Sequence, residues 1–332
     1  MTDNVQELTM DNHITYNNLL RYAFTRESSY ITDQKELWYP PEDYYEEGRV
    51  LGIFDGENLV SAITFEDYDL YIRGTLFKMG GLGGVATTPS HRNRGYIRNL
   101  LIACFEKMHQ KEIPITVLYP FKSSFYENFG YRLADEQHVF QIETLFFKIS
   151  PVEGYYIKEI FNYSEFVSII KSVYEQIAQG ARGYNYMVKR NEHNWKLRER
   201  NKGFNFVCYD KYNTPQGYLI LKPIKDANVK VVEPLSTMEI SEIFWLSAEA
   251  KQTLFNFIGA HKDQRKYALF STAEPKLFSY LKEFYIKSHK VWANSMARII
   301  DVPTVLSQIQ YPSMNTQVVL RVIDEHCSRN NK

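Results

Sequence analysis

The sequence predicts a mixed α/β fold built from two similar units, and three observations point to it. Helix-like spacing of apolar residues alternates along the chain with short apolar runs that are typical of strands. The chain has 332 residues, more than one hydrophobic core usually serves. Hydrophobic residues make up 44% of the chain and charged residues 23%, which is the profile of a soluble globular protein.

The first 150 residues predict helix, hairpin, strand, helix, strand, helix and strand. In that order the segments are 14–24, 49–72 with a turn at Asp55-Gly56, 75–87, 94–111, 113–121, 123–129 and 131–142. Within 94–111 the apolar side chains recur at steps of three and four and form one face: Ile97, Leu100, Leu101, Cys104, Phe105 and Met108. Ser123 or Ser124 is expected to cap the helix at 123–129, and Gly130 to end it.

A domain boundary is expected at Ser150-Pro151. The unit that follows mixes helices at 164–178, 191–200 and 249–259 with strands at 204–210, 216–224, 236–247 and 266–272. A third piece starts at residue 296 with a strand, a helix that begins with a proline, and one more strand at 316–324. A single strand makes no sheet, so we expect 296–332 to begin a further domain that is cut short.

Charge and cysteine content narrow the class of protein. Lysine plus arginine equals aspartate plus glutamate at 39 each, so no global basic field attracts nucleic acid. Cys104, Cys208 and Cys327 are far apart and fit neither a zinc site nor a disulfide framework, which favours a metal-free protein in the reducing cytoplasm. The N-terminus lacks a signal peptide pattern and the apolar runs are too short to cross a bilayer, so no membrane partner is expected.

The stretch GGVATTPSHRNRGYIRNLL at 83–101 places glycine and arginine at the start of an amphipathic helix. The first N–H groups of a helix have no partner within it, and the helix dipole is positive there. Glycine allows an anion to approach them, and Arg92, Arg94 and Arg98 add donors suited to phosphate. The pattern therefore favours a pyrophosphate cradle over 92–98. The alternative is an ordinary proline turn with solvated arginines.

Residues 85–101 resemble the acetyl-CoA motif of the GCN5-related N-acetyltransferases (GNAT), R/Q-x-x-G-x-G/A between a strand and a helix. Here the motif reads Arg92-Asn93-Arg94-Gly95-Tyr96-Ile97, with Ile97 in place of glycine or alanine. That departure resembles the Eis (enhanced intracellular survival) branch, which carries VAT-x-P-x-x-R-x-R-G. FYENFGY at 125–131 and MARIIDVP at 296–303 are similar to the same branch.

The resemblance implies a GNAT domain at 1–150, a second GNAT-like domain without a cofactor motif at 151–295, and the start of a domain like sterol carrier protein (SCP2-like) at 296–332. It implies acetyl-CoA as co-substrate, with the backbone of Val85, Ala86 and Thr87 beside the pantetheine arm. It also implies that Phe121 and Lys122 border the other side of the arm. The pyrophosphate would be held by Arg92, Asn93, Arg94, Gly95, Tyr96, Ile97 and Arg98.

Tyr126 matches the tyrosine that acts as proton donor in this family, and a phenol is protonated at neutral pH. Tyr131 is interpreted as structural. In the Eis branch a terminal carboxylate reaches the active site, but that assignment does not transfer to Lys332, so the base stays open. The carboxylates considered are Glu66, Asp67, Asp69 and those of the loop at 36–47. His91 is interpreted as a cap or surface residue.

The resemblance implies an amine acceptor, either a small polycation like an aminoglycoside or a lysine side chain, and a homo-oligomer, a trimer or hexamer. WYPPEDYYEEGR at 38–49 offers aromatics and acids that could wrap a polycation. One alternative is a non-catalytic protein that binds or senses CoA or a lipid. Another is an aminoacyl-tRNA-dependent peptidyl transferase, which the balanced charge disfavours.

Overall fold

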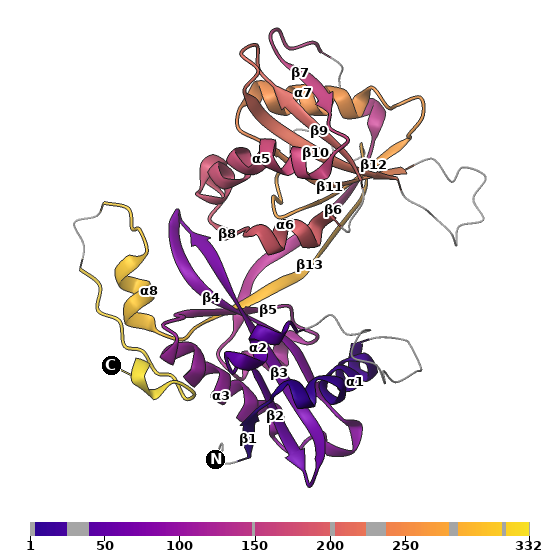
Figure 1. Cartoon of the computed structure of the whole chain (residues 1–332). Helices are drawn as coiled ribbons and strands as arrows, with labels where there is room; N and C mark the ends of the chain where they lie inside the picture. The colour runs from indigo at the N-terminus through magenta and orange to yellow at the C-terminus, as the bar shows by residue number, and fades with distance from the viewer. Residues whose placement is uncertain are drawn as a thin grey trace. The chain divides into compact units, whose positions relative to one another are not determined.

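The computed structural model divides into two compact units, each with strands and helices (Figure 1). It describes residues 4–24, 40–147, 150–199, 203–223, 237–278, 285–313 and 317–331. Unit 1 consists of residues 1–70, 76–134 and 295–332, and unit 2 of residues 71–75 and 135–294. The predicted assignment of domains to 1–150, 151–295 and 296–332 stays a prediction.

Unit 1 contains a mixed sheet with strand order β1-β2-β3-β4-β5-β13. Its elements are β1 (Val5–Glu7), α1 (His13–Phe24), α2 (Glu42–Glu46), β2 (Val50–Asp55), β3 (Asn58–Ile72), β4 (Thr75–Thr87), α3 (Tyr96–Gln110), β5 (Ile115–Leu118), α4 (Ser123–Glu127), the end of β13 (Ile286–Ile299) and α8 (Val302–Gln308). Strands β2 and β3 are antiparallel, β4 and β5 are parallel, and β5 and β13 are antiparallel.

Helix α3 packs on this sheet through the face that the sequence predicts. Leu100, Leu101, Cys104, Phe105 and Met108 are fully buried. They share one core with residues of β2, β3 and α4. Burying such a row removes apolar surface from water, which contributes about 25 cal/mol for each Å². This packing fixes the start of α3 relative to the ends of β4 and β5.

Unit 2 has strand order β6-β12-β11-β10-β9-β7, and its only parallel pair among the described residues is β11 with β12. Its elements are β6 (Arg132–Glu143), which starts in unit 1, β7 (Tyr156–Glu159), α5 (Tyr163–Ala178), β8 (Tyr186–Lys189), α6 (Glu192–Glu199), β9 (Phe204–Tyr209), β10 (Pro215–Pro223), β11 (Thr237–Trp245), α7 (Ala248–Gly259), β12 (Tyr267–Thr272) and most of β13.

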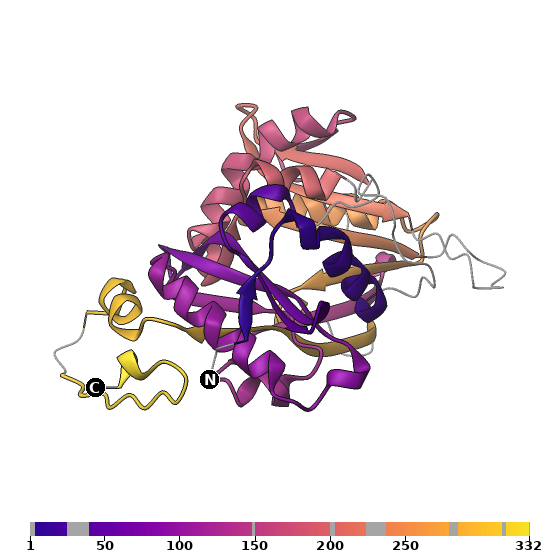
Figure 2. The same ribbon diagram turned by 60° about the horizontal axis from the view of Figure 1, so that its bottom comes forward.

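Helices α5 and α7 cover opposite faces of the sheet of unit 2, as both views of the molecule show (Figure 2). Leu219 and Leu221 of β10 share a core with α7, whereas Tyr218 and Ile220 share a core with α5. Successive side chains of a strand point to opposite faces, so the two helices lie on opposite sides of β10.

Most predicted elements are present, with two kinds of difference. The strand predicted at 316–324 is wrong over its described residues, 317–324, which adopt no regular structure. Val318, Val319, Leu320 and Ile323 are there 61–89% exposed, so the apolar run has no sheet to join. The sequence analysis also missed short elements, β1, α2, β7 and β8, and the first half of β13.

Candidate functional site

The parallel strands β4 and β5 part at one end of the sheet of unit 1. Their pairing runs from Met79 opposite Ile115 to Leu82 opposite Leu118. Strand β5 ends there, whereas β4 continues to Thr87. The last five residues of β4 therefore have no partner on β5.

Beyond its pairing with β5, the end of β4 directs alternate backbone groups to opposite edges of the strand. The carbonyl of Ala86 accepts a hydrogen bond from Ser61 Oγ on β3 (3.1 Å), and the next even residue, Thr88, donates its N–H to the carbonyl of Val60 (2.9 Å). Backbone groups of successive strand residues point to opposite edges. Of the three predicted contacts, Val85 and Thr87 therefore face the side that β5 has left.

The loop that follows β4 leads into α3 with unusual backbone geometry. Asn93 (φ 62°) and Gly95 (φ 78°) both adopt the left-handed conformation, and Gly95 is the N-cap residue of α3. It supplies no side-chain cap, and a Cβ placed on it would meet nothing within 4 Å. The first N–H groups of α3 are therefore left uncapped beside open space, which is the geometry that binds anions.

Cationic side chains surround this helix start. Arg92, Arg94 and Arg98 are exposed, and none of them forms an ion pair with another described residue. Arg94 donates a long hydrogen bond to the carbonyl of Ser90 (3.4 Å), within the same loop. No ion pair with a described residue neutralises these charges, and their contact with an anion stays a prediction.

His91 stabilises the loop and is not free to act as a base. Its Nε2 lies 2.9 Å from Asp55 Oδ2, and its Nδ1 lies 2.9 Å from the hydroxyls of both Thr88 and Ser90. Both ring nitrogens are therefore engaged inside the turn. This arrangement agrees with the interpretation of His91 as a cap or surface residue.

Tyr126 lies in α4, directly after β5, and is only 2% exposed. Its ring makes edge contacts with the rings of Phe121, Phe125 and Tyr131, at centroid distances of 5.6, 5.1 and 5.9 Å. Burial raises the pKa of its phenol to about 12. Its hydroxyl makes no hydrogen bond to another described residue. Tyr126 is therefore a fully protonated group with a free donor.

Phe121 and Lys122, between β5 and α4, are both exposed. Lys122 is the N-cap of α4 in an extended conformation, so the prediction of Ser123 or Ser124 as the cap is wrong. Ser123 is already the first helical residue, where its side chain is past the capping position. Gly130, with φ 79°, lies in the turn that ends the helix, as predicted.

Tyr131 is structural in its contacts. It is fully buried, and its hydroxyl lies 3.2 Å from Thr116 Oγ1, which donates to the carbonyl of Gly80 (2.9 Å). Burial raises its pKa well above the ordinary value for tyrosine. The Tyr131 hydroxyl thus supports the Thr116 side chain, which joins β5 to β4 just before the two strands part.

The acidic residues of β3 differ in their partners. Asp67 pairs with Arg49 (2.8 Å), and Asp69 pairs with Lys78 (2.8 Å). Burial raises the pKa of Asp67, and the charge of Arg49 opposes that rise. Glu66 has no hydrogen bond or ion pair among the described residues. It is therefore the one carboxylate of the three that is free for a cationic ligand.

The aromatic segment at 38–49 does not have the exposed face that was expected. Tyr44 and Tyr45 are each 5% exposed and belong to the core around α1 and β2. Tyr45 Oη lies 2.9 Å from Nδ1 of the buried His13. These two rings are used in packing and do not face a ligand, whereas the acids Glu42, Asp43, Glu46 and Glu47 are exposed. Binding of a polycation by 38–49 stays a prediction. Residues 36–39 of the predicted loop lie outside the described residues.

The corresponding helix start in unit 2 is closed. Strand β11 ends at Trp245 and α7 begins at Ala248, which leaves only two residues between them. Ser247 caps the helix by accepting a hydrogen bond from the N–H of Ala250 (3.1 Å). The N–H of Ala250 at the start of α7 is therefore already bonded within the chain.

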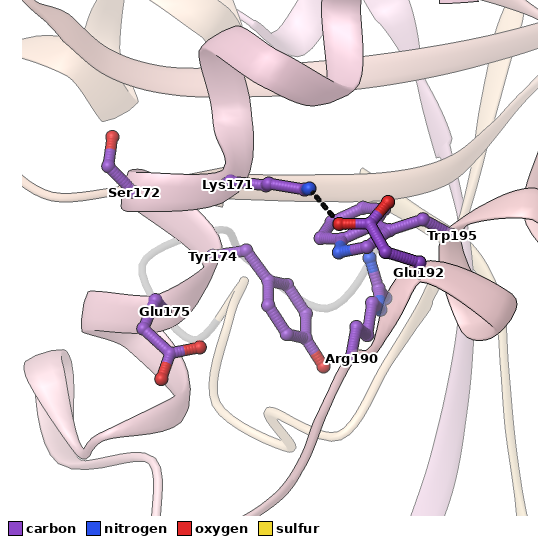
Figure 3. A pocket seen from close by; sticks show the side chains of 7 residues that line it. All are labelled: Lys171, Ser172, Tyr174, Glu175, Arg190, Glu192 and Trp195. Atoms are coloured by element: carbon purple, nitrogen blue, oxygen red, sulfur yellow. Dashed lines mark hydrogen bonds and ion pairs between the residues drawn. The ribbon is translucent and has the colours of Figure 1, made fainter. Parts of the chain in front are cut away.

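Unit 2 instead contains a cavity of about 310 Å³ between α5 and α6. Its lining residues are Lys171, Ser172, Tyr174, Glu175, Arg190, Glu192 and Trp195 (Figure 3). The guanidinium of Arg190 lies 3.9 Å from the ring centre of Tyr174 and 4.7 Å from that of Trp195. It is neutralised by the buried Glu242, at 2.9 and 2.5 Å. The positive charge of Arg190 is therefore paired with a carboxylate and is not free for a ligand.

Within the ranges given above, no group of three or more His, Cys, Asp and Glu side chains could hold a metal ion. In the same part of the chain, no helix is both long and apolar enough to cross a membrane.

Unit 1 thus combines two parallel strands that part with a following helix whose start is uncapped and surrounded by arginines. Models of the acetyltransferase (GNAT) domain match residues 4–134 and residues 186–299. The chain therefore carries two GNAT domains in tandem and belongs to the GNAT acetyltransferases, a class of enzymes.

Solved structures share this fold over nearly the whole chain. A conserved protein of unknown function from Enterococcus faecalis V583 is 22% identical, with a TM-score of 0.80 over 98% of this chain and 80% of that one. A GCN5-related N-acetyltransferase from Anabaena variabilis is 21% identical, with a TM-score of 0.78 and the same coverage. Eis1 from Mycobacterium abscessus is 16% identical, with a TM-score of 0.75 over 98% and 81%. No curated protein matches the sequence.

Proposed function

We propose that unit 1 transfers the acetyl group of acetyl-CoA to an amine of a small polycationic molecule, aminoglycoside-like in its charge, or to a lysine side chain. The observation that carries the proposal is the contrast between the two helix starts. Helix α3 begins uncapped beside three exposed arginines, whereas α7 is capped by Ser247. The start of α3 can accept a diphosphate without losing a capping hydrogen bond, whereas the start of α7 would have to give up the bond from Ala250 to Ser247.

In this proposal the chain holds acetyl-CoA by three sets of groups. Backbone N–H groups from Asn93 to Arg98 hold the pyrophosphate, with the arginine side chains as additional donors. Backbone groups of Val85 and Thr87 pair with the pantetheine arm like an added strand, while Ala86 stays bonded to Ser61. Phe121 and Lys122 border the other side of the arm.

Transfer needs an unprotonated amine nitrogen, which attacks the thioester carbonyl carbon. A C–N bond forms, the C–S bond breaks, and the thiolate takes a proton. We assign that proton to the Tyr126 phenol, which a pKa of about 12 keeps protonated. We assign recognition of the cationic amine, and acceptance of its proton, to Glu66, the carboxylate of β3 without a partner among the described residues.

The test of the donor is Tyr126→Phe in a thiol-release assay with acetyl-CoA and a panel of amines. We expect kcat to fall about 100-fold, because a general acid contributes at least that much. Binding of CoA should stay within about twofold, since the cradle at α3 is unchanged. Tyr131→Phe is the matched control, a neighbouring buried phenol, and should retain most activity. Equal rates for Tyr126→Phe and the unmodified protein would remove Tyr126 from this role.

The test of the amine site is Glu66→Gln. Loss of the unpaired carboxylate should raise KM for a polycationic amine about 10-fold and leave KM for acetyl-CoA unchanged, because removing one desolvated charge contact costs about 1.4 kcal/mol or more. Asp69→Asn, on the same strand and already paired with Lys78, is the control. Equal effects of the two substitutions on KM for the amine would contradict the assignment.

A further inference from the structure

Residues 324–331 form a compact segment within unit 1. Asp324 Oδ1 accepts hydrogen bonds from the N–H groups of His326 and Cys327, both at 3.0 Å, and its Oδ2 accepts one from Asn330 Nδ2 (3.0 Å). Cys327 is 1% exposed and belongs to the same core as Tyr126. Figure 1 shows this segment, in yellow, beside α3.

Arg298 joins this segment to the turn after α4. It lies on β13 opposite Thr116 of β5, with its side chain 4% exposed. One guanidinium nitrogen bonds both carboxylate oxygens of Asp324 (2.6 and 2.8 Å), and the other donates to the carbonyl of Phe129. The guanidinium also stacks over the ring of Phe105, 4.6 Å from its centre. Both terminal guanidinium nitrogens are thus bonded, whereas Nε is buried without a hydrogen-bond partner. A buried charge held in this way is costly to leave with one partner missing.

The same turn holds Tyr126. The N–H of Phe129 and that of Tyr131 both donate to the carbonyl of Tyr126, at 2.9 and 3.3 Å. A Cβ on Gly130 would lie 2.0 Å from the Arg298 Nη1, so glycine is what allows the arginine to reach the turn. Helix α4 has only five residues, too few to be stable without tertiary contacts. The position of Tyr126 therefore depends on what holds the turn.

We propose that Arg298 and Asp324 form a positioning pair that fixes the α4 turn and thereby aims the Tyr126 hydroxyl at the sulfur of the leaving thiolate. The inference rests on the proposed function of Tyr126 as proton donor. Neither partner of the pair touches the substrates. Each acts through the Phe129 carbonyl, either directly, as Arg298 does, or by neutralising and orienting the arginine, as Asp324 does.

The experiment compares Arg298→Lys and Asp324→Asn with the unmodified chain. Lysine keeps the charge but lacks the planar fork that presents separate nitrogens to the carbonyl and the carboxylate, and asparagine keeps the shape of the acceptor without its charge. We expect each to lower kcat about 10-fold, since small misplacements of a reacting group are that costly, with KM for acetyl-CoA within about twofold. Arg190→Lys is the matched control, because Arg190 is equally buried and paired with a carboxylate, but in unit 2. It should leave kcat unchanged.

A double-mutant cycle separates this inference from the function of Tyr126. If the pair acts through Tyr126, Arg298→Lys lowers kcat in the unmodified chain but has almost no further effect on Tyr126→Phe. Additive losses would overturn the positioning role while leaving Tyr126 as the donor. Full activity of Tyr126→Phe would instead overturn the proposed function itself.

Hydrogen exchange tests the structural step without turnover. Arg298→Lys should speed amide exchange at residues 123–131 at least about 10-fold and leave α7 unchanged, because local opening of the turn becomes easier. Unchanged exchange at 123–131 would overturn the inference whatever the activity of the protein.

Discussion

Gly84 illustrates how one residue shapes the end of β4. It has φ 59°, and a Cβ at this position would lie 2.0 Å from Tyr16 Oη. That hydroxyl is itself bonded to the buried Thr64 Oγ1 (2.7 Å), so it has little freedom to move. Glycine is therefore needed here both for the backbone conformation and for the space.

Gly84→Ala should consequently lower the free energy of unfolding by about 3 kcal/mol, from left-handed strain and overpacking together. Gly56→Ala is the control, since Gly56 has nearly the same φ (60°) but nothing within 4 Å of a Cβ. It should lose only about 1 kcal/mol. Urea denaturation of both variants measures the difference, and equal losses would show that Tyr16 gives way.

The placement of a site residue could be predicted where the neighbouring residues in the sequence determine it. Tyr126 could be placed on a short helix after a buried strand because its neighbours carry that pattern. The three acids of β3 could not be ranked, since their partners come from elsewhere in the chain: Arg49 precedes β2 and Lys78 lies on β4. The contact between Arg298 and the Phe129 carbonyl spans 169 residues and leaves no trace in local periodicity.

Among the helices, α5 shows how one cap supports a whole element. Asn162 accepts a hydrogen bond from the N–H of Glu165 (3.0 Å) and so satisfies one of the first donors of a 16-residue helix. We expect Asn162→Ala to lower the free energy of unfolding by about 1 kcal/mol. Asn162→Ser, which keeps an acceptor oxygen, should lose much less. Thermal unfolding compares the two, and a neutral alanine variant would contradict the argument.

Elements with a strong apolar period were predictable, and those without one were not. Helices α3, α5 and α7 each bury a row of side chains at helical spacing. The first half of β13, IKSHKVWANS, is polar and largely exposed, so no alternation marks it as a strand. The segment 317–324 is the opposite case, because its composition favours a strand but it adopts none. A strand needs a partner strand, and the described residues do not provide one there.

At the scale of the molecule, the sequence predicts two α/β units, but it does not predict that two strands contribute residues to both units. Helical and strand patterns occur twice along the chain. In each unit a helix connects two parallel strands: α3 connects β4 to β5, and α7 connects β11 to β12. The division, however, falls inside β6, after Ala134, and inside β13, after Asn294. Those two strands contribute residues to both units. Pairing between distant strands decides this, and local composition carries no information about it.

Unit 2 depends on a buried charge cluster assembled from distant residues. Glu242, 8% exposed, accepts hydrogen bonds from Arg190, Arg198 and Tyr218. Burial alone would raise the pKa of Glu242, but the two arginines outweigh it and lower that pKa from 4.5 to about 2. Because the folded pKa is depressed, the stabilisation is fully present above pH 4.5 and is lost as the pH falls toward 2.

Glu242→Gln should therefore be about 3 kcal/mol less stable than the unmodified chain at pH 6, with the gap closing between pH 4.5 and pH 2. Glu192→Gln, which removes an exposed ion pair with Lys171, is the control and should show no such gap. Fluorescence of the buried Trp195 and Trp245 reports unfolding of unit 2 in urea. A gap that stays constant from pH 6 to pH 3 would mean that packing, and not the ionisation of Glu242, accounts for the loss.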